Sequence, residues 1–398
     1  MPRRPFAALR QRAGEEQRAS FLELFFDLVF VFAVTQLSQY LLHHLTFGGA
    51  ARTLFLLLVV WWAWIYTTWM TNWFDPDAVS VRAVLLVGML ASLLMSVAIP
   101  DAFGSRAPLF ALGYVGLQLL RNAFTVVAIP RNDTLRPTFV RIWIWSSWVA
   151  VPWIVGAFLP SGARAVVWTL ALVLDYAGPF FGYWAPVIGR SQTTDWELEH
   201  AHFAERFQLF IIIALGESIV ASGATGSSLE LTAARGAAIV VAFVVTAELW
   251  WLYFDEVAAR SQADFAAADD DRGRLGRDAY TYIHIPIVAG IVVSAVGDEL
   301  VIAHPGEPLG TAGLVALAGG PVLYLLGHVS FRLRMRRTLS WKRLVAAAAI
   351  ALTAVLGVWI SGLAVAILVA VELAVLCGVE TAGRLALRGT RAGLPATR

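Results

Sequence analysis

The sequence predicts an all-α protein, a polytopic transmembrane helix bundle of about 12 spans arranged as two parallel six-helix repeats. Three observations predict it. First, the 398-residue chain is 59% hydrophobic and only 15% charged, with a mean hydropathy of +0.69, whereas soluble proteins carry roughly 25% charged residues. Second, its apolar residues form runs of the length that spans a bilayer as a helix, about 20 residues. Third, its basic residues gather in alternate connecting segments, as expected for helices that cross a membrane back and forth.

Apolar runs of spanning length follow one another along almost the whole chain. The boundary between the last two rests only on Ser361 and Gly362, and it is supported by the even count rather than by a strong turn signal. The predicted helices occupy residues 21–45, 52–74, 81–100, 107–129, 138–159, 163–188, 203–222, 234–256, 279–301, 310–331, 341–359 and 361–384.

The basic residues predict how these helices are oriented. With the N-terminus in the cytoplasm, 24 of the 30 lysines and arginines fall in inside segments or at the adjoining helix ends, 4 in outside segments or at the adjoining helix ends, and 2 well inside predicted helices. This asymmetry follows the positive-inside rule, and a wrong helix count would scramble it. We therefore expect a multi-pass protein of the bacterial inner (plasma) membrane with both termini in the cytoplasm.

Five matches between the two halves of the chain indicate an internal duplication, with similarity by chance between Trp- and Leu-rich helices as the alternative. An even number of helices per repeat would give both repeats the same orientation. The matched pairs are FLELF at 21–25 with FAERF at 203–207, WWAW at 61–64 with WWLY at 250–253, Asp101 with Asp298, LQLLRN at 117–122 with LYLLGH at 323–328, and Asp175 with Glu372. The predicted boundaries are an N-terminal tail at 1–19, repeats at 20–190 and 203–384, a linker at 191–202 and a C-terminal tail at 385–398.

Ionisable residues inside the predicted spans are the candidate functional residues. A charge at the bilayer centre costs about 2.5–3.5 kcal/mol on insertion scales and commonly marks an ion or proton path. The alternative is a set of buried ion pairs that fixes helix packing. The candidates for an ion or proton pathway are Glu23, Asp27, Arg121, Asp175, Glu205, Arg206, Glu217, Glu248, His284, His328 and Glu372, and Asp298 also lies within a predicted span.

Depth along the helices suggests how these residues pair. At 1.5 Å per residue, Asp27 and Arg121 lie about 9 and 12 Å from the cytoplasmic ends of their helices. We therefore expect an Asp27–Arg121 ion pair, and by the same argument an Arg206–Glu248 pair. Glu217, in LGES at 215–218, has no basic residue predicted at its depth and is a candidate to bind a proton or cation. The acidic run at 269–271 is expected to be a solvated loop.

Composition and motifs limit the other function classes. The net charge of +2 gives no reason to expect a nucleic-acid partner, and the single Cys377 excludes an intrachain disulfide or a thiolate metal cluster. The chain has no HExxH, P-loop or paired CxxC motif, so we expect no enzymatic activity, no cofactor and no metal site. The expected partners are the lipid bilayer and an ion or small solute, and the oligomeric state is left open.

Two stretches carry a family resemblance. ELFFDLVFVFAVTQLS at 23–38 and HFAERFQLFIIIALGESIVASG at 202–223 resemble the bacterial low temperature requirement A (LtrA) family over nearly the whole chain. The resemblance implies a multi-pass membrane protein linked to growth in the cold and supplies no biochemical activity. The first stretch is also similar to a helix of a potassium-channel family with two six-helix repeats, from which it departs at Phe21 and Phe26.

Two functional hypotheses follow from the sequence. The first is transport or conduction of an ion or small solute by means of the buried acidic residues, with channel and carrier both open. The alternative is a non-transporting structural or lipid-sensing membrane protein that aids cold adaptation.

Overall fold

The computed structural model describes residues 9, 18–192, 196, 198–258, 265 and 272–392. Most of the predicted N-terminal tail, the end of the predicted C-terminal tail, most of the loop after residue 258 and the acidic run at 269–271 lie outside the described residues. Within them, every regular element is a helix. In chain order the elements are α1 Phe21–His43, α2 Phe47–Trp73, α3 Val79–Ala98, η1 Ile99–Asp101, α4 Ala107–Ala128, α5 Arg136–Ala157, α6 Ser161–Ala177, α7 His200–Ser228, α8 Ala233–Leu252, η3 Tyr253–Ala258, α10 Arg272–Leu275, η5 Gly276–Tyr282, α11 His284–Ala303, α12 Thr311–Arg336, α13 Trp341–Leu356, η6 Gly357–Trp359 and α14 Gly362–Ala392.

Eleven helical segments of the described residues are long and apolar enough to cross a membrane. The remaining predicted span, the sixth, corresponds to α6, which has 17 residues and is therefore about 26 Å long, close to the roughly 30 Å hydrocarbon core. The all-α, polytopic fold predicted from the sequence is confirmed.

The predicted end of the sixth span is wrong, because α6 ends at Ala177 rather than near residue 188. Gly178 and Pro179 follow, and proline has no backbone N–H with which to continue a helix. The chain then turns through Gly182, Tyr183, Val187 and Gly189, which all have positive φ angles. The apolar composition of 178–188 had concealed these turns.

The described residues form two compact units. The first comprises Met1–Ile213 and Ser261–Ile285, and the second comprises Ala214–Arg260 and Pro286–Arg398, so α7 contributes to both. The two units are defined by contacts between residues and not by similarity between the two halves of the sequence. The two six-helix repeats therefore stay a prediction.

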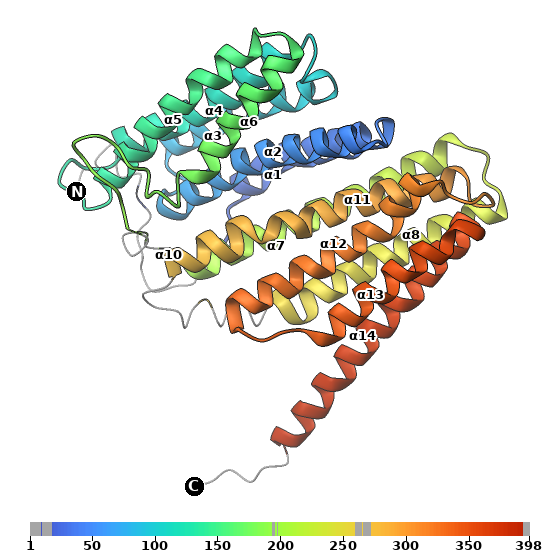
Figure 1. Cartoon of the computed structure of the whole chain (residues 1–398). Coiled ribbons are helices and arrows are strands. Elements are labelled where there is room, and N and C mark those ends of the chain that lie inside the picture. Colours follow the sequence, from blue (N-terminus) through green and yellow to red (C-terminus); the bar gives the residue numbers. More distant parts are fainter. Residues whose placement is uncertain are drawn as a thin grey trace. The chain divides into compact units, whose positions relative to one another are not determined.

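In the first unit, α3, α4, α5 and α6 pack successively against one another, and α2 packs against α1, α4 and α6 (Figure 1). Helix α2 is the interior element, since Trp61, Trp62 and Trp64 are each at most 1% exposed. A helix that is apolar on every side belongs inside a bundle. Helix α5 differs, because only 22% of its most apolar 18-residue stretch is buried, and the rest is available to contact lipid.

In the second unit, α12 packs against α13, and α14 packs against α8 and α13. Helices α11 and α12 approach closely through glycines: a Cβ atom on Gly320 would lie 2.4 Å from Oγ of Ser294, and one on Gly297 would lie 2.4 Å from Cα of Leu317. Small residues at the contact between membrane helices allow this backbone approach.

Candidate functional site: buried charged clusters in the membrane helices

The first unit contains a fully buried ion pair between Asp27 on α1 and Arg206 on α7, neither of which is exposed at all. Nη1 of Arg206 lies 2.6 Å from Oδ2 of Asp27, and Nη2 lies 2.7 Å from Oδ1. The indole N–H of Trp64 on α2 also donates to Oδ1 at 2.9 Å. The guanidinium group lies over the Trp64 ring, 5.8 Å from its centroid. A bidentate pair of this kind fixes both side chains in one geometry.

The predicted Asp27–Arg121 and Arg206–Glu248 pairs are therefore wrong. Asp27 and Arg206 bind each other, and Arg121 on α4 contacts other groups. Depth along a helix gives only the axial position of a residue. Which helices are neighbours, and which face each one presents, must also be known before a partner can be assigned.

A second acid on α1 extends the cluster. Oε1 of Glu23 lies 2.8 Å from Nε2 of His202 and 3.8 Å from Nε of Arg206. Oε2 accepts the backbone N–H of Ser20 at 2.8 Å, and the Ser20 hydroxyl caps α1 in return. Glu23 is therefore both part of a capping box and a partner of two basic groups on α7.

The remaining contacts extend this cluster toward neighbouring elements. Nδ2 of Asn72 on α2 lies 3.2 Å from Nδ1 of His202 and also donates to the backbone oxygen of Glu199. Glu205 is half-buried and accepts the backbone N–H of Ala19 at 2.7 Å. The cluster thus joins α1, α2 and the start of α7.

The partners share a simple sequence signal. Glu23 and Asp27 lie four residues apart on α1, and His202 and Arg206 lie four apart on α7. Residues at this spacing share a helix face, so two acids on one helix face two basic residues on the other. His202 and Trp64 were not among the predicted site residues. The matching i, i+4 pairs of opposite charge are the feature that would have indicated His202.

Arg121 lies in a different part of the first unit and is 2% exposed. Its Nη1 donates to the Ala63 carbonyl and the Thr67 hydroxyl, its Nε donates to Asn122, and its Nη2 donates to Gln118. Among the described residues no carboxylate lies within ion-pair distance of this guanidinium.

Asp175 on α6 is connected to Arg121 through neutral groups. Nε2 of Gln118 donates to the Tyr114 hydroxyl at 2.9 Å, and that hydroxyl donates to Oδ2 of Asp175 at 2.8 Å. The indole N–H of Trp153 donates to the same oxygen at 2.9 Å. Arg121 and Asp175, both predicted site residues, therefore end one buried hydrogen-bonded chain.

His284, also in the first unit, is 1% exposed and its Nδ1 donates to the backbone oxygen of Ala279 at 3.1 Å. Its ring stacks on Tyr280 and contacts Phe207 edge-on. Aromatic packing and one backbone hydrogen bond hold the side chain in place.

In the second unit, His328 on α12 belongs to another buried ion pair. Arg343 on α13 binds Glu380 on α14 through two contacts of 2.9 and 3.0 Å. It also donates to Nδ1 of His328 at 2.6 Å and to the backbone oxygen of Leu252. Neither Arg343 nor Glu380 was among the predicted site residues.

The other acids of the second unit are held differently. Glu248 on α8, Asp298 on α11 and Glu372 on α14 each have one buried carboxyl oxygen without a hydrogen-bond partner in the described part of the chain. The second oxygen of Glu372 accepts from Thr353 at 2.7 Å. Glu217 on α7 is 1% exposed, and the structure places it in this unit as well. Next to Asp298, Glu299 accepts from Thr225 at 3.0 Å, and the sequence reasoning did not single it out.

These observations first define a class of protein. The helices are long enough to span a bilayer, and large apolar side chains such as Leu86 and Leu90 on α3 stay exposed, while charged side chains within the helices, such as Asp27, Arg206 and Arg343, are buried. Such a distribution is that of a multi-pass integral membrane protein. The chain belongs to the family described as Bacterial low temperature requirement A protein (LtrA), which matches it over residues 18–378.

A relative supports the assignment. An uncharacterized protein of Rhizobium meliloti (strain 1021) is 39% identical over 322 residues, covering 80% of this chain and 78% of the relative. No solved structure matches the chain.

Proposed function

We propose that this protein moves an ion or small solute across the bacterial inner membrane, with protons or monovalent cations carried by buried carboxyl groups of the second unit. The observation that supports the proposal is the lack of compensating partners around the carboxyl groups of Glu248, Asp298 and Glu372 among the described residues. Each has a buried oxygen without a hydrogen-bond partner, and none forms an ion pair with a cation of the described residues. A carboxyl group inside a membrane protein without a cationic partner is a place where a proton or cation can reside.

The buried acids of the first unit differ from those of the second unit, because they have partners in the protein. Asp27 is ion-paired with Arg206, and Glu23 is hydrogen-bonded to His202, so both acids already have partners within the protein. Exchange of a proton or cation there would first have to break a buried ion pair, which is costly. We assign these acids to fixing the helices and assign the mobile charge to the acids of the second unit.

The compensated cluster of the first unit also favours the second candidate function, a non-transporting structural or lipid-sensing membrane protein. In that role every buried acid would serve packing, and replacing any one of them would change stability without changing ion movement. We propose no enzymatic activity and no cofactor for either role.

The test uses the full-length protein reconstituted in liposomes with a pH-sensitive dye inside, under imposed proton, sodium and potassium gradients. We expect protein-dependent ion movement that falls toward the rate of protein-free liposomes in Glu248→Gln, Asp298→Asn or Glu372→Gln. Glu307→Gln is the matched control, since the Glu307 side chain is 75% exposed beyond the end of α11.

Each variant is first checked for a monodisperse elution profile and for its unfolding temperature, so that a loss of flux is not a loss of fold. If wild-type protein moves none of these ions faster than protein-free liposomes, the proposal is overturned. It is also overturned if all three variants transport as the wild type does.

A further inference from the structure

The first unit contains a cavity of about 50 Å³ that neither Asp27 nor Arg206 lines. Residues of α2, α4, α5 and η5 line it, together with Pro179, Tyr183 and Trp196 from the segment between α6 and α7. Seven of the lining residues are aromatic, two are arginines and none is acidic. A water molecule requires about 10–15 Å³ on this measure, so the cavity has room for a few waters or one small ion.

Arg121 supplies the first unused hydrogen-bond donor at this cavity. A guanidinium has five N–H donors, and four of those of Arg121 are directed at the Ala63 carbonyl, Thr67, Asn122 and Gln118. One N–H on Nη2 remains, and no carboxylate among the described residues lies within ion-pair distance. The guanidinium also lies over the Tyr66 ring, 5.0 Å from its centroid. A buried cation held only by neutral groups is incompletely compensated.

Trp196 supplies a second donor, on an independent segment of the chain. The residue lines the cavity and is 6% exposed. Its indole N–H is buried and has no hydrogen-bond partner in the described part of the chain. An unsatisfied buried donor is unfavourable, so this N–H is suited to a ligand that accepts hydrogen bonds.

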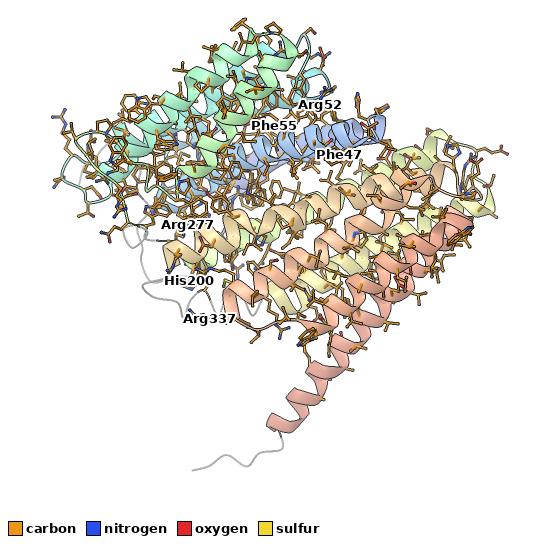
Figure 2. All side chains as sticks on the ribbon, viewed as in Figure 1. Phe47, Arg52, Phe55, His200, Arg277 and Arg337 are labelled. Atoms are coloured by element: carbon orange, nitrogen blue, oxygen red, sulfur yellow. The ribbon has the colours of Figure 1, made fainter. Side chains whose placement is uncertain are left out.

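The other polar groups around the cavity bring no negative charge. The hydroxyls of Tyr66 and Tyr183 bind each other, and burial raises the pKa of Tyr183, so its hydroxyl stays protonated. Arg277, labelled in Figure 2, has its own partner in Asp278 at 2.7 Å and lies over the Phe180 ring. The cavity thus presents donors and a positive charge.

We propose that this cavity is a binding site for a small monovalent anion, of the size of a halide or a one- or two-carbon carboxylate. The anion accepts the free N–H of Arg121 and the indole N–H of Trp196, and its charge compensates the buried guanidinium. The site goes beyond the proposed function, because it holds whether or not the carboxyls of the second unit carry ions.

Binding is tested on the purified full-length protein in detergent. Sodium bromide, chloride, formate and acetate are titrated at constant ionic strength, with sodium gluconate, whose anion is much larger, replacing them. We expect a saturable rise in unfolding temperature with the small anions, as for any ligand that binds only the folded state. Bromide should also quench tryptophan fluorescence saturably, because several of the aromatic wall residues are tryptophans.

Two variants connect the response to the site. Trp196→Phe keeps the ring and removes only the indole N–H, so affinity should fall about tenfold or more, the effect of one hydrogen bond to a charged group. Arg121→Gln should abolish saturable binding. Trp148→Phe, on the exposed face of α5, and Arg164→Gln, which does not line the cavity, should bind as the wild type does.

The proposal is overturned if the small anions act no differently from gluconate on the wild type. It is also overturned if Trp196→Phe and Arg121→Gln respond like the wild type. Should Arg121→Gln fail to fold, Trp196→Phe alone decides. Since binding in detergent needs no flux, failure of this site is distinct from failure of the transport proposal.

Discussion

At the scale of single residues, the Asp27–Arg206 pair shows what a buried charge requires in this protein. Two guanidinium nitrogens and one indole nitrogen bind a carboxylate that has no exposure to solvent. Such a pair need not be more favourable than apolar residues of the same shape. Removal of one partner is different, because it leaves the other charge buried and uncompensated.

Asp27→Asn is therefore expected to destabilise the protein by about 3–5 kcal/mol, measured by denaturant or thermal unfolding in detergent. The double variant Asp27→Leu with Arg206→Met should recover much of this loss, since neither charge remains. The control is Asp77→Asn, which breaks the exposed Arg82–Asp77 pair at 2.8 Å and should cost less than about 1 kcal/mol. Equal losses in the buried and exposed single variants would contradict this account.

The residue scale also shows what the sequence can and cannot specify. Asp27, Arg206, Arg121 and Asp175 were all selected from their positions in apolar runs, and the structure buries each of them. The partners predicted for Asp27, Arg121 and Arg206 were wrong, because a partner depends on which helix faces which. His202 was missed although it lies four residues before Arg206, because the predicted span began at residue 203 and left His202 in the linker, whereas α7 begins at His200.

At the scale of elements, the close contact between α11 and α12 depends on glycines, which have no side chain to hold the two backbones apart. Both the backbone nitrogen and Oγ of Ser294 lie within 2.5 Å of the place where a Cβ atom on Gly320 would sit. Gly319, the preceding residue, has only a side-chain atom of Val315 at 3.7 Å from its corresponding point. Adjacent glycines on one helix therefore face different surroundings.

Gly320→Ala should destabilise the protein by about 1–3 kcal/mol, because backbone packed at this distance must move apart to admit a methyl group. Gly319→Ala should be neutral or stabilising by about 1 kcal/mol, since alanine favours the helix over glycine. Unfolding temperatures of the two variants in the same detergent provide the comparison. The interpretation fails if Gly320→Ala is as stable as Gly319→Ala.

Helix existence was more predictable than helix ends. The break predicted at Ser361 and Gly362 is confirmed, since η6, which follows α13, ends at Trp359 and α14 begins at Gly362. The C-terminal end of α6 was not, because the turn that follows it is almost as apolar as the helix. In a membrane protein, hydropathy reports burial in lipid or protein, and only residues such as Gly178 and Pro179 report backbone geometry.

At the scale of the whole molecule, the chain crosses the membrane repeatedly, and the distribution of arginine predicts which connecting segments face the cytoplasm. The segment after α3 contains Ser105, and the segment after α4 contains Asn132; both side chains are exposed. In the second unit, Glu307 and Thr338 occupy the corresponding segments before and after α12.

Single cysteines introduced into a Cys377→Ser background test this orientation. In intact cells, an impermeant maleimide should label cysteines at Ser105 and Glu307, while cysteines at Asn132 and Thr338 should react only after lysis. The reverse pattern would show that the orientation is inverted. A mixed pattern within one unit would show that a predicted span is missing.

The bond between Asp27 and Arg206 joins residues 179 positions apart in the chain, which has a consequence for biosynthesis. At about 5–20 residues per second, the ribosome reaches Arg206 on the order of 10–40 s after Asp27. During this interval α1 enters the bilayer while Asp27 still lacks its ion-pair partner, because Arg206 has not yet been synthesised. Trp64, only 37 residues after Asp27, is the first of the partners of Asp27 to be synthesised. The nascent chain therefore passes through a stage in which α1 depends on the insertion machinery or on the indole of α2. A chain truncated before α7 would remain in that stage and be exposed to membrane proteases.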